Sequence, residues 1–496
     1  MRVAFIAAEC EPFAKTGGLG DVVDALARAL GRTKPSSGIE PPVDVYLPCY
    51  RGIIDCADAV RTTLRVPDPR AEGGLSDVGL VTFDAEGYRV RLVDAPAAFD
   101  RAGLYGPPAD GDYPDNAWRF GLLCRTALEA IRADADAGRV VDLVHLHDWH
   151  AAPTLLYRDG PAADVPAIAR LAAVQTLHNL AYHGWTPNES LDQLGLGPYT
   201  PVAAGTDGTD LLREGVLRSE IANTVSPTYA AEALTSEYGF GLQAALAAKG
   251  DRFVGILNGL DLETWNPATD ETLPATYDMA DRTGKAACRR DLLARIGFDP
   301  DDPSPVVGMI GRLDPQKGFD LLAAAAPRLL DDGARIVVLG SGDSSLAKPF
   351  RALAAARPDG ISLNETFDRG LARRIYAGAD VFAMPSRFEP SGQGQMIAMR
   401  YGTPPVARAT GGLVDSVVDE AERPGAGTGF LFGPATPTAL AEACETAFAV
   451  RGRNGDAPGW QRLLDRAMAV DLSWERTAAW RYVEAYRRAI AIRARR

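Results

Sequence analysis

Two lysines lie close before a glycine at the expected start of a helix. Lys15 lies in KTGGLGDV (15–22) and Lys317 in GRLDPQKGFDLL (311–322), and each loop follows an apolar run. A cation beside glycine backbone at a helix N-terminus is a common way to hold a phosphate group. One such lysine is usually only solvated, but two at matching places in two halves of the chain favour a ligand that carries phosphate.

Other phosphate and metal motifs are incomplete. The pair Gly284-Lys285 has Met279 where a P-loop needs its first glycine, and no complete G-x-G-x-x-G follows an expected strand. There is also no G-x-S-x-G to supply a serine nucleophile. The segment HLHDWH (145–150) holds three histidines, but no other part of the chain obviously supplies the remaining ligands of a metal. Hydrogen bonding and stacking against a sugar is an equally suitable use for this segment.

Apolar runs alternate with Ala/Leu-rich stretches of helical periodicity, and this alternation occurs twice along the chain. Runs this apolar are expected as parallel strands with helices on both faces of the sheet. The expected strands lie at 3–9, 43–48, 141–147, 171–178, 306–311, 334–340, 379–385 and 403–409, with helices at 318–330 and 371–379 in the second half.

The two alternating regions meet near NGLDLETWNP (258–267). We expect one domain over 1–260 and a second over 261–473, with a C-terminal helix (474–496) that packs back on the first. The predicted fold class is α/β, with two doubly wound domains facing each other across a deep cleft. Ligands of such sheets bind outside the carboxyl ends of the strands, so the loops after the first strand of each half are the most informative.

Composition describes a folded chain with an acidic balance. Of 496 residues, 46% are hydrophobic and 24% charged, and 52 Lys and Arg against 65 Asp and Glu give a net charge of −13. This field repels nucleic acid. Six cysteines without a CxxC pair and the absence of a signal-peptide core or a membrane-spanning run predict a cytoplasmic protein with no membrane partner. Pro/Gly-rich segments at 66–74, 106–114 and 423–434 are candidates for mobile loops.

The ordered motifs resemble the bacterial glycogen synthase and plant starch synthase family. This family consists of retaining glucosyltransferases of the GT-B architecture, which has two Rossmann-like domains, and the resemblance spans essentially the whole chain. The motifs are KTGGLGDV (15–22), HLHDWHA (145–151), TLHNLAYHG (176–184), VSPTYA (225–230), GILNGLDLETWNP (255–267), GRLDPQKGFDLL (311–322), PSRFEPSGQGQ (385–395) and YGTPPVARATGGLVDSV (401–417).

The resemblance implies transfer of glucose from ADP-glucose to the non-reducing 4-hydroxyl of an α-1,4-glucan such as glycogen, with retention of configuration. It implies no metal and no other cofactor, so the protein must itself neutralise the leaving diphosphate. Two alternatives remain at this stage. One is a related transferase that uses UDP-glucose or a small sugar acceptor, and the other is a catalytically silent glucan-binding protein.

The resemblance also assigns roles to individual residues. Arg312 and Lys317 match the family's phosphate clamp, and Glu389 matches the glutamate beside the donor glucose. The alternative for Arg312 is a structural salt bridge to Asp314 or Asp320. The other expected catalytic residues are Lys15, His178 and Asp148. His178 and Asp148 match positions that line the glucose. The alternative for these two is that they are hydrogen-bonded groups at strand ends with no role in the reaction. The expected substrate-binding residues are Lys15, Gly17, Gly18, Asp21, Glu9, Asn258, Phe367, Ser391, Gly392, Gln393 and Gly394.

The chain departs from the family pattern at several positions. Ser391 stands where many relatives have cysteine, and Gly394 replaces a frequent hydroxyl residue. Ile397 occupies the place of a second glutamate found in many other retaining GT-B enzymes, which favours the glycogen and starch branch. Phe367 lies where an aromatic often stacks on adenine, and Phe99 lies where a tyrosine is common.

Overall fold

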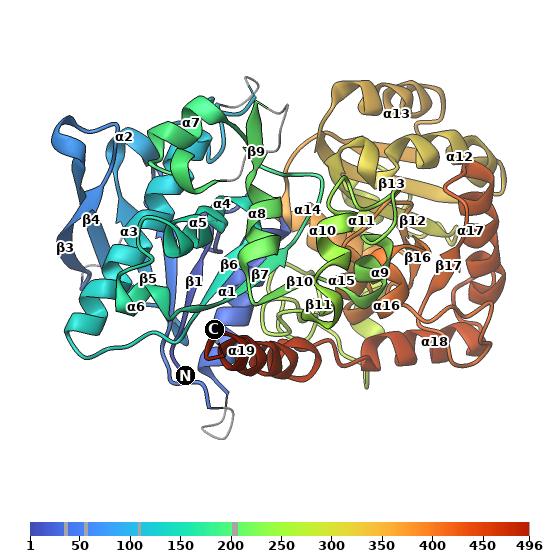
Figure 1. Cartoon of the computed structure of the whole chain (residues 1–496). Helices are drawn as coiled ribbons and strands as arrows, with labels where there is room; N and C mark the ends of the chain where they lie inside the picture. The colour runs from blue at the N-terminus through green and yellow to red at the C-terminus, as the bar shows by residue number, and fades with distance from the viewer. Residues whose placement is uncertain (34–37, 54–57, 108–110, 201–206, 496) are drawn as a thin grey trace. The chain divides into compact units, whose positions relative to one another are not determined.

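The computed structural model describes residues 1–33, 38–53, 58–107, 111–200 and 207–495 (Figure 1). The chain forms two compact units, Met1–Gly259 with Trp474–Arg496 and Leu260–Ser473. The division lies within one residue of the boundary expected from the sequence. Each unit contains one large sheet with helices on its faces, so the expected α/β class with two doubly wound sheets is confirmed.

Unit 1 is built on a nine-stranded sheet in the order β11-β10-β7-β6-β1-β2-β5-β4-β3. The pairings from β11 to β5 are parallel, whereas β4 pairs antiparallel with both β5 and β3. The strands are β1 (Val3–Ile6), β2 (Val43–Pro48), β3 (Val60–Pro67), β4 (Leu75–Asp84), β5 (Tyr88–Asp94), β6 (Leu143–His147), β7 (Ala172–Leu177), β10 (Ile221–Thr224) and β11 (Phe253–Gly255). A separate antiparallel pair is formed by β8 (Trp185–Pro187) and β9 (Gly208–Asp210).

The central strands of unit 1 are buried along their whole length, which is why their sequences are mostly apolar. Helices cover them, and α1 places Leu19, Val22, Val23, Leu26 and Leu30 on its buried face at helical spacing. The helices of unit 1 are α1 (Gly18–Gly31), α2 (Pro96–Phe99), α3 (Asn116–Asp136), α4 (Asp148–Ala151), α5 (Pro153–Asp159), α6 (Pro166–Ala169), α7 (Asn188–Gln193), α8 (Leu211–Arg218), α9 (Pro227–Glu232), α10 (Gln243–Ala247) and α19 (Trp480–Arg493).

Unit 2 contains a six-stranded, entirely parallel sheet in the order β14-β13-β12-β15-β16-β17. Its strands are β12 (Val306–Leu313), β13 (Arg335–Gly342), β14 (Ile361–Asn364), β15 (Val381–Met384), β16 (Pro405–Arg408) and β17 (Phe430–Phe432). Its helices are α11 (Thr283–Arg295), α12 (Phe319–Asp331), α13 (Ser344–Ala356), α14 (Arg369–Gly378), α15 (Gly394–Arg400), α16 (Gly411–Ser416), α17 (Pro437–Arg451) and α18 (Pro458–Ala469).

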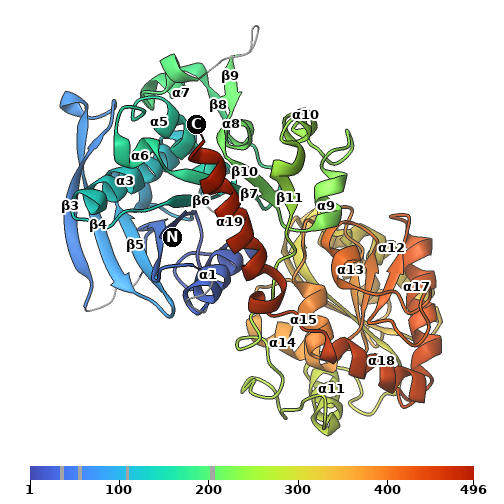
Figure 2. The same ribbon diagram turned by 60° about the horizontal axis from the view of Figure 1, so that its bottom comes forward.

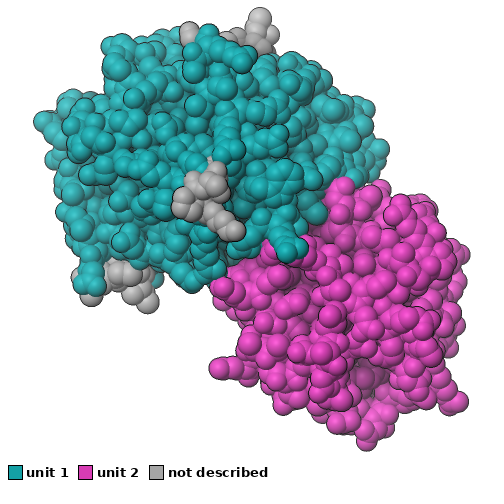
Figure 3. Space-filling model, turned by 90° about the horizontal axis from the view of Figure 1, so that it is seen from below, with its two compact units in different colours: residues 1–259, 474–496 teal, residues 260–473 magenta. Residues whose placement is uncertain are grey.

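The C-terminal segment belongs to unit 1. A π-helical turn at Glu475–Ala479 leads into α19, which packs against β6, β7 and β10 and lies beside the sheet in Figure 2. Figure 3 colours residues 474–496 with the rest of unit 1. Tyr482 and Tyr486 of α19 are fully buried, and Arg493 donates to the Ala169 carbonyl. The helix expected from the spacing of hydrophobic and aromatic residues is therefore present, although the sequence contains no signal for the π turn.

The proline- and glycine-rich segments differ in structure. Residues 66–74 end β3 and include a 3₁₀ turn at Glu72–Gly74, and 423–434 contain β17. The segment 106–114 includes residues 108–110, which lie outside the described residues. No helix within the described parts of the chain is long and apolar enough to cross a membrane.

Unit 1 contains a buried ion pair between Arg158 and Glu220, whose loss tests how much burial contributes to the strength of an ion pair. Arg158 Nη1 and Glu220 Oε2 are 3.0 Å apart with no exposed side-chain surface, and Glu220 Oε2 also accepts from the Ala173 amide at 2.8 Å. Replacing Glu220→Ala removes one of the two carboxylates that bind Arg158, the other being Asp159, and also removes the acceptor of the Ala173 amide. We expect this to cost about 1–3 kcal/mol of stability. Calorimetric unfolding measures it.

The matched control is Glu445→Ala, which removes a carboxylate from a solvent-exposed pair with Arg328 in unit 2. We expect little measurable change because exposed pairs contribute little. Equal losses in the two variants would contradict the role given to burial.

Candidate functional site

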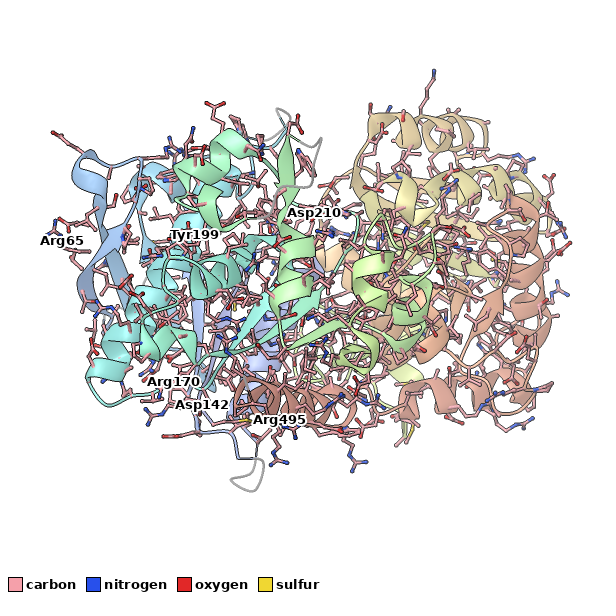
Figure 4. All side chains as sticks on the ribbon, in the orientation of Figure 1. Arg65, Asp142, Arg170, Tyr199, Asp210 and Arg495 are labelled. Carbon is pink, nitrogen blue, oxygen red and sulfur yellow. The ribbon has the colours of Figure 1, made fainter. Side chains whose placement is uncertain are left out.

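Both sheets reverse their strand order beside their first strand. In unit 1 the chain builds outward from β1 through β2 on one side and β6 on the other, and in unit 2 from β12 through β13 and through β15. Open α/β sheets bind ligands at the carboxyl ends of strands at such a switch point. Figure 4 labels Asp142 and Arg170, which precede β6 and β7 and so mark the opposite, amino edge of the unit 1 sheet.

The loop after β1 is held in shape by the carboxylate of Glu9. Glu9 is 3% exposed and accepts hydrogen bonds from the backbone amides of Thr16 and Gly17, at 2.7 and 3.2 Å. The Thr16 and Tyr105 hydroxyls donate to its other oxygen, at 2.7 and 2.5 Å. These four donors occupy the carboxylate, so Glu9 organises the loop that carries Lys15.

Lys15 lies beside the first turn of α1. Its ammonium pairs with Asp21 and lies 3.5 Å from Glu11 Oε2. Burial raises the pKa of the Asp21 carboxyl, while Lys15 opposes that rise. A Cβ added at Gly17 or at Gly18 would meet no atom within 4 Å, so the backbone at the start of α1 is open to a close approach by a ligand. The first amides of the helix have no side-chain cap there.

Asp148 and His178 lie together at the carboxyl ends of β6 and β7. Asp148 Oδ1 accepts the His178 backbone N–H at 2.7 Å. Asp148 has φ of 55°, a left-handed conformation that costs a non-glycine residue energy and is typical of functional sites. Burial, with a smaller contribution from the Glu9 charge, raises the pKa of Asp148 to about 7, and burial lowers that of His178 to about 3.

The other histidines of HLHDWH form a buried cluster beneath this edge. The His145 and His147 ring centroids are 4.2 Å apart, and His147 Nδ1 is 3.0 Å from His178 Nε2. Burial holds the pKa of both rings well below the usual range. His150 instead stacks on Trp149 and Tyr105. Across the described residues, no group of three or more His, Cys, Asp or Glu side chains is placed to hold a metal.

Asn258 follows β11 at the end of unit 1. It is 4% exposed, and its Oδ1 is buried without a hydrogen-bond partner in the described part of the chain. Buried carbonyl groups of this kind are uncommon, so the atom is available to a ligand. Phe99, in contrast, is fully buried and packs against Tyr50 and Phe120, so its ring is part of the core of unit 1.

In unit 2, the loops after β12 and β15 bring Lys317 and Glu389 together. Lys317 Nζ is 3.0 and 2.7 Å from the two oxygens of Glu389, and the Ser386 hydroxyl donates to Oε2 at 2.9 Å. Glu389 is 4% exposed. Gly318, with φ of 72°, precedes α12, and a Cβ there would lie 2.1 Å from the Pro385 carbonyl oxygen, so only glycine allows the two loops to approach.

Arg312 has an exposed guanidinium that makes no ion pair or hydrogen bond with any residue the structure describes. The structural alternative for Arg312 is therefore wrong. Asp314 caps the amide of Gln316, and Asp320 is bound to Arg387 instead. This unpaired cation lies three residues beyond the buried run of β12 and is free to bind an anion.

The segment from Ser391 to Gln395 forms a tight turn that leads into the first residues of α15. Gly392 has φ of 69°, and Gln395 Nε2 donates to the Ser391 and Gly392 carbonyls at 2.9 and 3.2 Å. The Ser391 hydroxyl is buried with no partner among the described residues, and Gln393 provides no side-chain cap for the helix. Gly394 has space for no side chain without pressing on Phe382, whose ring carbon lies 3.0 Å from an added Cβ.

Phe367 and Ile397 are two further positions of unit 2 at which the sequence raised an expectation. Phe367 follows β14 and is 77% exposed, with the Arg369 guanidinium 5.8 Å from its ring. Ile397 is 4% exposed within α15, so no second carboxylate lies there.

Sequence reasoning missed several supporting residues. Tyr105 donates to Glu9 from nearly one hundred positions away, and Ser386 donates to Glu389. Gly412 packs on Ser391, because a Cβ there would lie 2.3 Å from the Ser391 carbonyl oxygen. The repeated glycines in ATGGLVDSV are the one local signal for such a contact.

Known proteins match this chain over its whole length. A family described as the starch synthase catalytic domain matches residues 2–248, and glycosyl transferases group 1 matches residues 304–449. A glycogen synthase of Geotalea daltonii is 38% identical over all of both chains. Those of Aromatoleum aromaticum and Anaeromyxobacter dehalogenans (strain 2CP-1) are 41% and 42% identical, over 100% and 98% of this chain and 97% and 99% of theirs.

Solved structures agree. The catalytic domain of starch synthase IV from Arabidopsis thaliana, bound to ADP and acarbose, superimposes with a TM-score of 0.86 at 34% identity, over 99% of each chain. A sucrose-phosphate synthase from Thermosynechococcus elongatus shares the fold at 18% identity, with a TM-score of 0.58 over 99% of each chain. The two sheets thus have the GT-B architecture expected from the motifs. The chain belongs to the glycogen synthase and starch synthase family of glycosyltransferases.

Proposed function

We propose that this protein is a glycogen synthase that transfers glucose from ADP-glucose to the non-reducing 4-hydroxyl of an α-1,4-glucan, with retention of configuration. The observation that carries the proposal is the group at the switch point of unit 2, where the Lys317–Glu389 pair lies on the same carboxyl edge as the unpaired Arg312. A diphosphate needs cations and amide donors, and a sugar cation needs a nearby carboxylate. This edge supplies both.

In the proposed reaction, the bond from the anomeric carbon to the diphosphate oxygen breaks as the acceptor oxygen bonds to the same carbon. Arg312, Lys317 and the amides at the start of α15 stabilise the negative charge on the departing ADP. Glu389 stabilises the positive charge that develops on the sugar. The proton of the acceptor hydroxyl passes to the leaving phosphate on the same face, so the products are ADP and a glucan longer by one residue.

The carboxyl edge of unit 1 provides a second set of groups in this proposal. Asp148 and His178 bind hydroxyls of the donor glucose, and Asn258 offers its buried oxygen to the donor. Lys15 adds a positive charge beside the open backbone of Gly17 and Gly18, where Asp21 orients its ammonium. Phe367 offers an exposed aromatic face to adenine. With these charges supplied by side chains, the proposal includes no metal or other cofactor, and we place the reaction in the cytoplasm.

The first prediction concerns the two substrates. We expect release of ADP from ADP-glucose to depend on glycogen, with UDP-glucose used much less well. The measurement is nucleoside diphosphate release from each donor, with and without glycogen. Release that ignores glycogen would point to a small acceptor, preference for UDP-glucose would change the donor, and no release from either would favour a silent glucan-binding protein.

The second prediction concerns Glu389. Because its carboxylate is most valuable when charge develops on the sugar, Glu389→Gln should lower kcat by about 10²–10³-fold and change the donor Kd much less. Ser386→Ala keeps the carboxylate and removes one hydrogen bond, so it should lose no more than about tenfold. Steady-state rates and donor titration separate the two quantities, and equal losses in kcat and donor affinity would contradict the role.

The third prediction concerns Arg312. A lysine keeps the charge but not the planar pair of donors, so Arg312→Lys should raise the donor KM and lower kcat/KM by about 10²-fold. Arg351→Lys is the control, since Arg351 is an exposed arginine already paired with Glu365 in the same unit. Initial-rate kinetics against ADP-glucose measure both, and unchanged kinetics in Arg312→Lys would remove this residue from the phosphate site.

A further inference from the structure

Two neutral histidines share one hydrogen bond at the edge of unit 1. His147, the last residue of β6, has its Nδ1 3.0 Å from Nε2 of His178, which follows the neighbouring strand β7. The rings are nearly parallel, with an interplanar angle of 27°. Burial lowers the pKa of both rings far enough that both are neutral near pH 7. A neutral imidazole carries one N–H and one bare nitrogen, so one ring donates and the other accepts.

The second nitrogen of His147 decides which ring donates. His147 Nε2 is fully buried and has no hydrogen-bond partner in the described parts of the chain. A buried N–H without an acceptor is rarer and more costly than a buried acceptor without a donor. The proton of His147 therefore lies on Nδ1, and the N–H there donates to His178 Nε2.

The neighbours of His147 hold its ring in this orientation. It packs against Phe5, with centroids 5.1 Å apart, and against His145, with centroids 4.2 Å apart, and these two rings also contact each other. His145 is itself held by Thr176, 2.6 Å from its Nε2, and by the Tyr486 hydroxyl of α19, 2.8 Å from its Nδ1.

The proton positions around His145 follow from the same reasoning. Thr176 donates to Asn223 Oδ1 at 2.7 Å, so its oxygen accepts from His145 Nε2–H. His145 Nδ1 then accepts from the Tyr486 hydroxyl. Both nitrogens of His145 are thus satisfied, and this ring offers nothing to His147 except packing.

We propose that His147 is a positioning residue that fixes His178 in the tautomer with its proton on Nδ1, so that His178 presents an N–H donor at the carboxyl edge of the sheet. His178 is half-buried, and no described residue forms a hydrogen bond with its Nδ1. The group that His178 recognises is therefore an oxygen that accepts. A sugar hydroxyl meets this requirement through its lone pairs, and this reading of the ligand rests on the proposed function.

The first test is spectroscopic and needs no activity. The chain has five histidines, so the full-length protein labelled with ¹⁵N-histidine gives five pairs of ring nitrogens, which single substitutions assign. We expect His147 and His178 each to show a protonated Nδ1 and a bare Nε2, and His145 to show the reverse. A protonated Nε2 on His178 in the native protein would overturn the proposal.

Two variants test whether His147 sets this state. His147→Phe keeps a flat ring packed against Phe5 and His145 but removes the donor, and we expect His178 to lose its single tautomer. His147→Asn places an amide N–H near the position of Nδ1, and we expect it to restore the native tautomer of His178. A native His178 spectrum in the phenylalanine variant would overturn the proposal. If that variant does not fold, the spectra of the native protein and of His147→Asn still decide.

Kinetics connect the tautomer to the ligand. We expect His147→Phe to lower kcat/KM for ADP-glucose about tenfold, and His147→Asn to recover to within about threefold of the native value, as for the loss and return of one hydrogen bond. A spectrum as expected with no turnover of any nucleotide sugar would contradict the proposed function and leave the positioning role intact. The expected turnover together with a protonated Nε2 on His178 would contradict the positioning role and leave the proposed function intact.

Discussion

A parallel sheet that is buried on both faces can expose its backbone and polar side chains only at its two edges. In both units the central strands are mostly apolar, so the candidate site residues lie at or just beyond the carboxyl ends. The reversal of strand order at β1 and at β12 separates the loops there and leaves room beside them. The placement of Lys15, Asp148, Arg312 and Glu389 follows from this one constraint.

The buried glutamates Glu9 and Glu389 both lie at these edges but differ in their hydrogen-bond partners. Glu9 accepts four hydrogen bonds, three from the loop it organises and one from Tyr105, and has little capacity left for a ligand. Glu389 is bound by Lys317 and Ser386, and both partners lie on loops at the switch point. A carboxylate beside a reacting sugar can stabilise a developing positive charge. The contacts of Glu9 therefore suit it to organising its loop, and those of Glu389 are compatible with the role proposed for it.

The parallel strands could be predicted because burial on both faces leaves a continuous apolar run. The antiparallel β3 and β4 were not predicted, since β3 is largely exposed and its residues VRTTLRVP show no such run. Motifs located the site residues in the chain, but local sequence contains no signal for contacts such as Tyr105 with Glu9. Asp320 pairs with Arg387 rather than with Arg312, and this pairing likewise depends on tertiary structure. Nor does any sequence pattern indicate the left-handed backbone of Asp148.

Three polar groups without protein partners among the described residues lie near the carboxyl ends of strands. In most of the fold, buried charges are paired, as with Arg158 and Glu220, because a folded chain loses stability for each polar group left unsatisfied. The hydroxyl of Ser391 and the amide oxygen of Asn258 depart from this rule, and the exposed guanidinium of Arg312 is unpaired among the described residues. Ser391 and Asn258 follow the carboxyl ends of strands, and Arg312 lies near the carboxyl end of β12, where ligands of such sheets bind. A cation, a hydroxyl and an acceptor oxygen are the groups that a phosphorylated sugar would satisfy. A ligand that bonded to Ser391 and Asn258 would recover the stability lost by leaving their buried groups without partners.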